Sequence, residues 1–246
     1  MMRPYLRRVL SMPIKAIVFD MDDTLYSEKD YVYSGFKQLD HWVLKEFGKQ
    51  GFLLKAWNCF CTHRSHNIFN QVLHELQIPY DQNVINHMVN LYRNHKPNIQ
   101  LYEDAAWILD SLEQEHIKIG LISDGFLHSQ QHKLNALNIK DKFHAIVLSD
   151  ELGRDCWKPS VAPYERICLE LGVSHHECLY IGDNIMKDFI TAKALGWTTI
   201  HIDREGGLYS GITLKAEYEA DYKIHNLREL YIIGKLNKLW TEEVIV

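Results

Sequence analysis

The sequence predicts an α/β protein with a parallel β-sheet covered by helices on both faces and a helical segment inserted after the first strand. Short apolar runs typical of buried parallel strands recur along the chain, beginning with residues 14–19. From about residue 101 onward, such runs alternate with stretches of helix-spaced apolar residues. Residues 27–98 show helical spacing without a strong strand signal. Together these observations favour a sheet-based core and an α-helical insertion.

The predicted elements follow one another in a simple order. Residues 14–19 form the first strand, and the insertion carries helix-spaced Phe36, Leu39, Trp42, Val43 and Phe47. The later elements are a helix at 102–115, a strand at 117–122, a helix at 128–137, a strand at 145–148, a helix ending at 171, a strand at 178–181, a helix ending near 196, and strands at 198–202 and 220–224. We expect Ser160 to be the N-cap of the helix that ends before Gly172.

Four regions describe the expected domain organisation. The core comprises residues 14–26 and 99–230, and the helical insertion comprises residues 27–98. An N-terminal extension covers residues 1–13 and a C-terminal tail covers residues 231–246. With 246 residues and 46% hydrophobic composition, the chain can bury a full core.

Charge and cysteine content narrow the class of protein. The net charge of −5 provides no basic field for a nucleic-acid backbone, so we expect no nucleic-acid partner. The five cysteines are an odd number without a disulfide-like spacing, which suits a reducing compartment. The sequence shows neither a signal-peptide pattern nor a run of transmembrane length. We therefore expect a cytoplasmic protein with no membrane association.

Polar residues follow several of the predicted strands directly. Because the carboxyl ends of parallel strands meet at one edge of a sheet, these residues should converge there. A lysine in the loop motif Trp-Lys-Pro-Ser is expected to join them. The predicted site comprises Asp20, Asp22, Ser123, Asp124, Lys158, Asp183 and Asp188.

The residue types in this set suit phosphate chemistry. A buried carboxylate such as Asp20 is costly unless a positive group compensates it, and a divalent cation with a phosphate ester would do so. Asp20 could then attack phosphorus as a nucleophile, while Asp22, on the same side of an extended backbone, could act as acid and base. Asp183 would complete an oxygen-rich shell for Mg²⁺, and Asp188 would orient a metal-bound water or pair with Lys158.

The remaining members of the set would bind the phosphate itself. The Ser123 hydroxyl and the backbone N–H groups of Asp124 and Gly125 are suited to donate to its non-bridging oxygens. Lys158 would screen Asp20 from the incoming anion and stabilise charge in the transition state. Trp157 could brace the lysine loop or line the pocket.

These motifs carry a resemblance to the haloacid dehalogenase superfamily of hydrolases. Its D-x-D motif resembles the sequence from Asp20 to Thr24, and its acidic motif resembles the sequence from Gly182 to Asp188; its Ser and Lys motifs match Ser123 and Lys158. The resemblance implies a Rossmann-like three-layer core with a helical cap. It also implies Asp20 as nucleophile, Asp22 as acid and base, and Mg²⁺ held by Asp20, the Asp22 carbonyl and Asp183. Family members that displace halide lack the second Asp, so Asp22 favours a phosphatase.

The resulting prediction is a Mg²⁺-dependent phosphatase acting on a small phosphomonoester, such as a sugar phosphate or a nucleotide. A phosphomutase on the same core and a non-catalytic binding or scaffold protein remain alternatives. Asp188 could instead only cap or solubilise its helix. For the cluster at residues 63–66, and for Arg93 and His95, a solvated surface is favoured over contact with an anionic substrate. The sequence predicts neither the substrate nor the oligomeric state.

Overall fold

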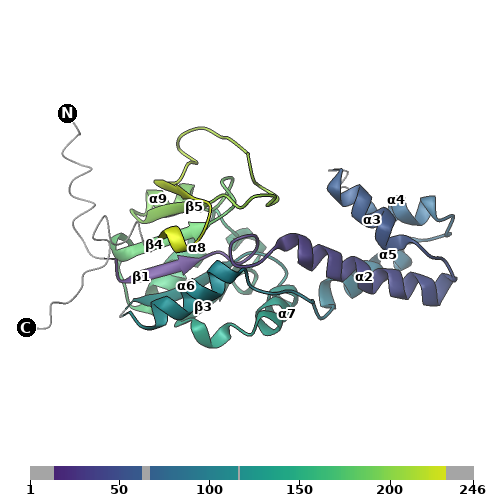
Figure 1. The fold of residues 1–246 in the computed structure, drawn as a ribbon, viewed down its shortest axis with the longest axis horizontal. Coiled ribbons are helices and arrows are strands. Elements are labelled where there is room, and N and C mark those ends of the chain that lie inside the picture. The colour runs from purple at the N-terminus through teal and green to yellow at the C-terminus, as the bar shows by residue number, and fades with distance from the viewer. Residues whose placement is uncertain (1–13, 63–66, 116, 231–246) are drawn as a thin grey trace, which may run out of the picture.

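The structure is a computed structural model that describes residues 14–62, 67–115 and 117–230. The predicted N-terminal extension, the C-terminal tail and the polar cluster at residues 63–66 lie outside the described residues. Figure 1 shows two parts, a sheet with flanking helices and a group of helices that extends away from one end of that sheet.

A six-stranded parallel sheet forms the centre of the first part of the described chain. Its spatial order is β3-β2-β1-β4-β5-β6, so the chain builds outward from β1 in one direction and then in the other. Phe19 of β1 is in register with Leu121 of β2 and Ile181 of β4, which aligns the ends of these strands. The strands are β1 (Ala16–Phe19), β2 (Lys118–Ser123), β3 (Ala145–Leu148), β4 (Cys178–Gly182), β5 (Thr198–Ile202) and β6 (Tyr222–Ile224).

Helices cover both faces of the sheet. Alternate residues of β1 point to opposite faces, so Ile17 and Phe19 join one apolar cluster and Ala16 and Val18 join another. The first cluster includes residues of α6 (Glu103–Glu113) and α7 (Leu127–Leu137), and the second includes residues of α8 (Ala162–Leu171) and α9 (Ile190–Ala194). The result is a three-layer α/β core, which confirms the predicted fold class.

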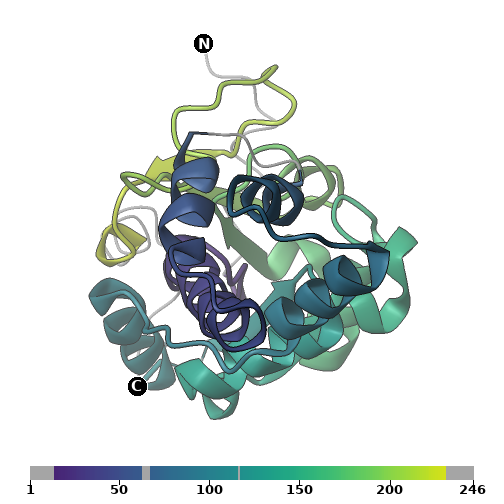
Figure 2. The same cartoon turned by 90° about the vertical axis from the view of Figure 1, so that its right-hand side faces the viewer.

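The second part consists of helices α2 (Glu28–Phe47), α3 (Phe52–Cys61), α4 (Ile68–Glu75) and α5 (Gln82–Asn94). They pack around their own apolar cluster, which includes Phe36, Leu39 and Val43 from one face of α2. Figure 2 looks along α2 and shows these helices in front of the sheet. Among the described residues, we find no helix with the length and apolar character needed to cross a membrane.

Several details differ from the sequence prediction. Helix α8 begins at Ala162 with Val161 at the N-cap, so the prediction of Ser160 as N-cap was wrong. The Ser160 N–H donates instead to the Trp157 carbonyl at 2.8 Å, because Ser160 closes the preceding turn. Short 3-10 helices occur in connections that the sequence left unassigned, namely η1 (Lys140–Lys142), η2 (Ser149–Leu152), η3 (Arg154–Cys156) and η4 (His175–Glu177).

Candidate active site

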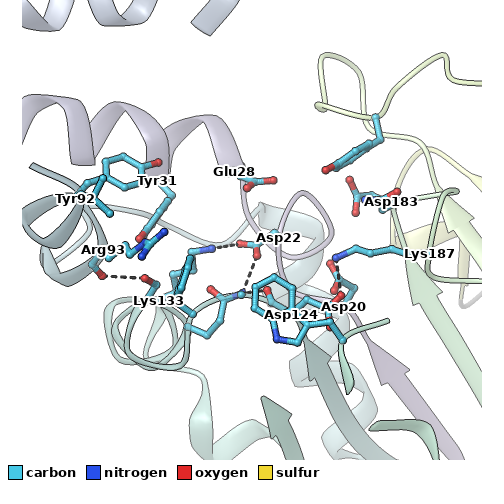
Figure 3. A pocket seen from close by; sticks show the side chains of 18 of the residues that line it. Asp20, Asp22, Glu28, Tyr31, Tyr92, Arg93, Asp124, Lys133, Asp183 and Lys187 are labelled. Carbon is cyan, nitrogen blue, oxygen red and sulfur yellow. Dashed lines mark hydrogen bonds and ion pairs between the residues drawn. The ribbon is translucent and has the colours of Figure 1, made fainter. Parts of the chain in front are cut away.

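Strand ends far apart in the sequence meet at one edge of the sheet. Asp20 follows β1, Ser123 is the last residue of β2, and Asp183 follows β4. The Asp20 N–H donates to the Ile181 carbonyl at 2.8 Å, which fixes the backbone at the point where the strand order reverses. A cavity of about 480 Å³ opens there, and Asp20, Asp22, Asp124 and Asp183 line it (Figure 3). Ser123, Lys158 and Asp188 are buried beside these residues.

Lys158 is the cation at the centre of this cluster. Its ammonium group lies 2.5 Å from Asp20 Oδ1, 2.7 Å from Asp188 Oδ1 and 2.8 Å from the Tyr180 hydroxyl. Burial by itself would lower the pKa of Lys158, but Asp188 and Asp20 outweigh it and raise that pKa well above the usual value. Lys158 therefore carries a permanent positive charge next to Asp20.

Three buried carboxylates, those of Asp20, Asp183 and Asp188, have oxygens within 4.8 Å of one another. Burial raises the pKa of Asp20 to about 7 in spite of Lys158. Burial, followed by the charges of Asp20 and Asp188, raises the pKa of Asp183 well above its usual range. Among the described residues, no cationic side chain forms an ion pair with Asp183. This excess of negative charge and the all-oxygen donor set fit a hard divalent cation.

Asp22 is held by three side chains that are not part of this cluster. Its Oδ1 accepts hydrogen bonds from Lys133 Nζ at 2.6 Å and from the Tyr26 hydroxyl, and its Oδ2 accepts one from Gln130 Nε2 at 2.9 Å. Burial opposes ionisation of this carboxyl, but Lys133 and the hydrogen bonds outweigh it and lower the pKa of Asp22. Asp22 is thus ionised in this arrangement.

The Ser123 and Asp124 segment is anchored from two directions. Gln130 Nε2 donates to Ser123 Oγ at 2.8 Å and to the Asp124 carbonyl at 2.5 Å. The Asp124 carboxylate accepts from the Lys158 N–H at 3.1 Å and from Lys187 Nζ at 2.8 Å. Burial would raise the pKa of Asp124, but Lys158 and Lys187 lower it overall. Its side chain thus ties together the loops that follow β2 and β4 and the loop of Lys158.

Asp23, directly after Asp22, has a structural role. Its φ is 49°, a left-handed conformation that Asp tolerates better than most residues. Its two carboxylate oxygens accept from the Glu28 N–H and the Leu208 N–H, each at 2.8 Å. Asp23 therefore links the start of α2 to a C-terminal loop.

Trp157 serves both roles considered for it. It lines the cavity, and its Nε1 donates to Asp150 Oδ1 at 3.2 Å, which braces the segment just before Lys158.

The sequence prediction missed several polar residues at this site. Gln130 and Lys133 lie on the buried side of α7 with Leu134 and Leu137, although the predicted helix gave them no role. The sequence signal that could have identified them is the presence of polar residues within the apolar stripe of this helix. Glu28 and Lys187 also line the cavity, but only the fold brings them there.

The fold and this carboxylate–lysine cluster define an α/β enzyme with an acidic site at the carboxyl edge of its sheet. The model of the haloacid dehalogenase-like hydrolase family matches residues 17–202. The chain therefore belongs to the haloacid dehalogenase-like hydrolase family, and the predicted family and hydrolase class are confirmed.

Individual relatives cover almost the whole chain. It is 28% identical to a glyceraldehyde 3-phosphate phosphatase from Methanocaldococcus jannaschii, over 90% of this chain and 97% of that protein. The identity to a glyceraldehyde 3-phosphate phosphatase from Methanopyrus kandleri is 27%, over 88% of this chain and 95% of that protein. A hydrolase of this family from Bacillus subtilis, solved with bound magnesium, has the same fold with a TM-score of 0.67 at 17% identity, over 90% of this chain and 99% of that one.

Proposed function

We propose that this protein is a Mg²⁺-dependent phosphatase that hydrolyses a small phosphomonoester through a phosphorylated Asp20. The observation that carries the proposal is the contact of one buried lysine with two of the three clustered carboxylates at the edge of the cavity. Such a site can compensate the negative charge of a phosphoryl group from several sides during its transfer. The names of the curated relatives agree with this class of substrate.

The proposed reaction has two steps. First, an Asp20 carboxylate oxygen attacks phosphorus, the bond to the ester oxygen breaks, and Asp22 gives a proton to the departing alkoxide. Second, Asp22 takes a proton from a water molecule that attacks the phospho-Asp20, which releases inorganic phosphate and restores Asp20. Because Asp22 is ionised here, its role as acid requires the negative charge of an arriving phosphate to raise its pKa.

Asp20, Asp183 and the backbone carbonyl of Asp22 would hold the metal in this proposal. Bound Mg²⁺ would neutralise charge on the phosphoryl oxygens. Asp188 is better placed to support the site than to bind the metal directly. Its Oδ1 accepts from Lys158, and its Oδ2 accepts from the Asn184 N–H at 2.9 Å.

Ser123 and the backbone N–H groups of Asp124 and Gly125 would bind the non-bridging oxygens. Gln130 supports this role, because its amide holds both Ser123 Oγ and the Asp124 carbonyl in place. Lys158 would share its charge between Asp20 and the phosphoryl group as negative charge develops.

We further propose that residues 27–98 form a cap over a core made of residues 14–26 and 99–230. Phe69, Val89 and Tyr92 of the helical part line the same cavity as Asp124 and Asp183 of the sheet part. A substrate in this cavity would be enclosed from both sides, which would exclude bulk water and add specificity contacts.

The test is phosphate release from a panel of phosphomonoesters, with Mg²⁺ and with a chelator. We expect turnover only with the metal, and a fall of about 1000-fold or more in Asp20→Asn. Asp110→Asn is the matched control, because the Asp110 side chain is 69% exposed and remote in sequence from every motif. Undiminished turnover in Asp20→Asn would overturn the nucleophile, and isomer formation without phosphate release would indicate a mutase.

A further inference from the structure

Arg93, in the last turn of α5, differs from the other cations of the cavity. Lys133 is paired with Asp22, Lys187 with Asp124, and Lys158 with Asp20 and Asp188. Arg93 lines the same cavity and is half-buried, yet within residues 14–62, 67–115 and 117–230 no carboxylate forms an ion pair with it. Its charge is therefore available to a ligand.

The Arg93 guanidinium is held in position by an aromatic ring. Its Cζ lies 3.4 Å from the centroid of the Phe126 ring, and Phe126 also lines the cavity. Arg154 Cζ lies 4.1 Å from the same centroid. Two guanidinium groups cannot share one face of a ring at these distances, so they stack on opposite faces. Stacking restricts the Arg93 fork before any ligand arrives.

The charges near Arg93 favour an anion. Burial, and then the positive charge of Arg154, lower the pKa of Arg93 from its usual value, although a guanidinium remains protonated under all ordinary conditions. A half-buried cation with a second cation nearby carries an uncompensated electrostatic cost. Binding of a negatively charged group would remove that cost.

The position of Arg93 is suited to the far end of a substrate. The Ser129 hydroxyl donates to the Arg93 carbonyl at 2.9 Å, and Ser129 lies four residues before Lys133 on α7. Four residues of helix correspond to about 6 Å. Because Lys133 contacts Asp22, the Arg93 backbone meets α7 about one turn from a residue that contacts the reaction site, and Figure 3 shows Arg93 beyond Lys133 as seen from Asp22.

We propose that the physiological substrate carries a second anionic group, a carboxylate or a second phosphate, and that Arg93 binds it. This inference rests on the proposed phosphatase function and narrows its substrate class. The planar guanidinium offers two parallel N–H donors that match either anion. Phosphomonoesters that are neutral apart from the scissile phosphate would leave this donor pair without a partner and would be poorer substrates.

Two matched substrate pairs test the proposal with the full-length protein and Mg²⁺. Glyceraldehyde 3-phosphate and 3-phosphoglycerate differ by an aldehyde against a carboxylate, and fructose 6-phosphate and fructose 1,6-bisphosphate differ by a second phosphate. We expect kcat/KM to favour the anionic member of one pair by about 10- to 100-fold, as for a hydrogen bond to a charged group. The pair that shows the preference identifies the anion.

Variants connect the preference to Arg93. In Arg93→Met the ratio within that pair should fall toward one, and Arg93→Lys should retain part of it. Arg154→Met is the matched control. It removes the other guanidinium that stacks on the Phe126 ring, and Arg154 is not among the residues that line the cavity. Its ratio should stay within about twofold of the native ratio. Equal kcat/KM in both pairs, or a preference that survives in Arg93→Met, would overturn the inference.

A binding experiment separates failure of the inference from failure of the proposed function. Calorimetric titration of the anionic substrate into Asp20→Asn and into Asp20→Asn/Arg93→Met should show about 10-fold weaker binding in the double variant. Arg93-dependent binding without turnover in the native protein would refute the phosphatase proposal alone. Turnover with equal binding to both variants would refute the role of Arg93 alone.

Discussion

Replacing Lys158 by Met tests the electrostatic design of the site. The Lys158 side chain is fully buried, and its ammonium group contacts Asp20 at 2.5 Å and Asp188 at 2.7 Å. Methionine retains much of the volume but removes the charge, so both carboxylates lose their cation. Removing one partner of a buried ion pair typically costs about 3–5 kcal/mol of the free energy of unfolding.

Protonation limits this cost and gives it a pH dependence. With Lys158 present the pKa of Asp20 is already raised to about 7, with burial as the main cause, and losing Lys158 raises it further. A carboxyl with a raised folded-state pKa is protonated in the folded protein at low pH, and that stabilisation is lost as the pH rises through the folded-state pKa. The destabilisation should therefore be smaller near about pH 6, where Asp20 is largely protonated in both proteins, than near about pH 8, where Asp20 of the native protein is ionised and paired with Lys158.

The assay is urea unfolding of the native protein and Lys158→Met with a chelator, at both pH values. Lys142→Met is the matched control, because Lys142 also bridges two carboxylates, Asp110 and Glu113, each at 2.8 Å, but at the surface. We expect the control to lose much less stability than Lys158→Met, because an exposed ion pair contributes little to the free energy of unfolding. A loss of less than about 1 kcal/mol in Lys158→Met near pH 8, or a larger loss near pH 6 than near pH 8, would refute the reasoning.

Two further predictions concern the walls of the cavity. Burial, followed by the charge of Asp22, raises the pKa of Glu28 to about 8, so Glu28 stabilises the fold at low pH and this contribution is lost as the pH rises toward 8. In thermal unfolding, Glu28→Gln should therefore lose less stability than the native protein as the pH rises toward 8. Parallel pH profiles of the two proteins would contradict this. In Gly125→Ala, where φ is 139°, the added Cβ would lie 2.8 Å from Gln130 Cδ and displace the Gln130 amide from Ser123. We expect kcat/KM to fall about tenfold. Gly153→Ala is the control, because Gly153 also has a positive φ but its added Cβ would have no neighbour within 4 Å, so this variant should keep its activity.

Much of the fold was predictable because local patterns specify it. The apolar runs that became β1 to β5 are short and are covered on both faces, so their composition alone identifies buried parallel strands. Where backbone geometry decided the outcome, prediction failed. Ser160 resembles an N-cap by residue type, but the turn that contains it ends before α8 begins.

The candidate site was predictable to the extent that its residues follow strands. Asp20, Ser123 and Asp183 converge because strand ends share an edge, whatever the connections between them. Gln130 and Lys133 lie inside a helix, where no strand end marks a polar residue as part of a site. Whether such a residue faces solvent or a cavity depends on how α7 docks on the sheet.

The amino-acid sequence by itself determined the family, the layered α/β core and the principal candidate residues, because these depend on hydrophobic periodicity and on motifs at strand ends. Only the tertiary structure decided how the charges are paired. It placed Lys133 on Asp22 and Lys187 on Asp124, and it left Arg93 without a carboxylate among the described residues. Ion pairing depends on distances of a few ångströms between segments far apart in the chain, and only the packing of α5 on α7 and the positions of the loops after β2 and β4 set those distances.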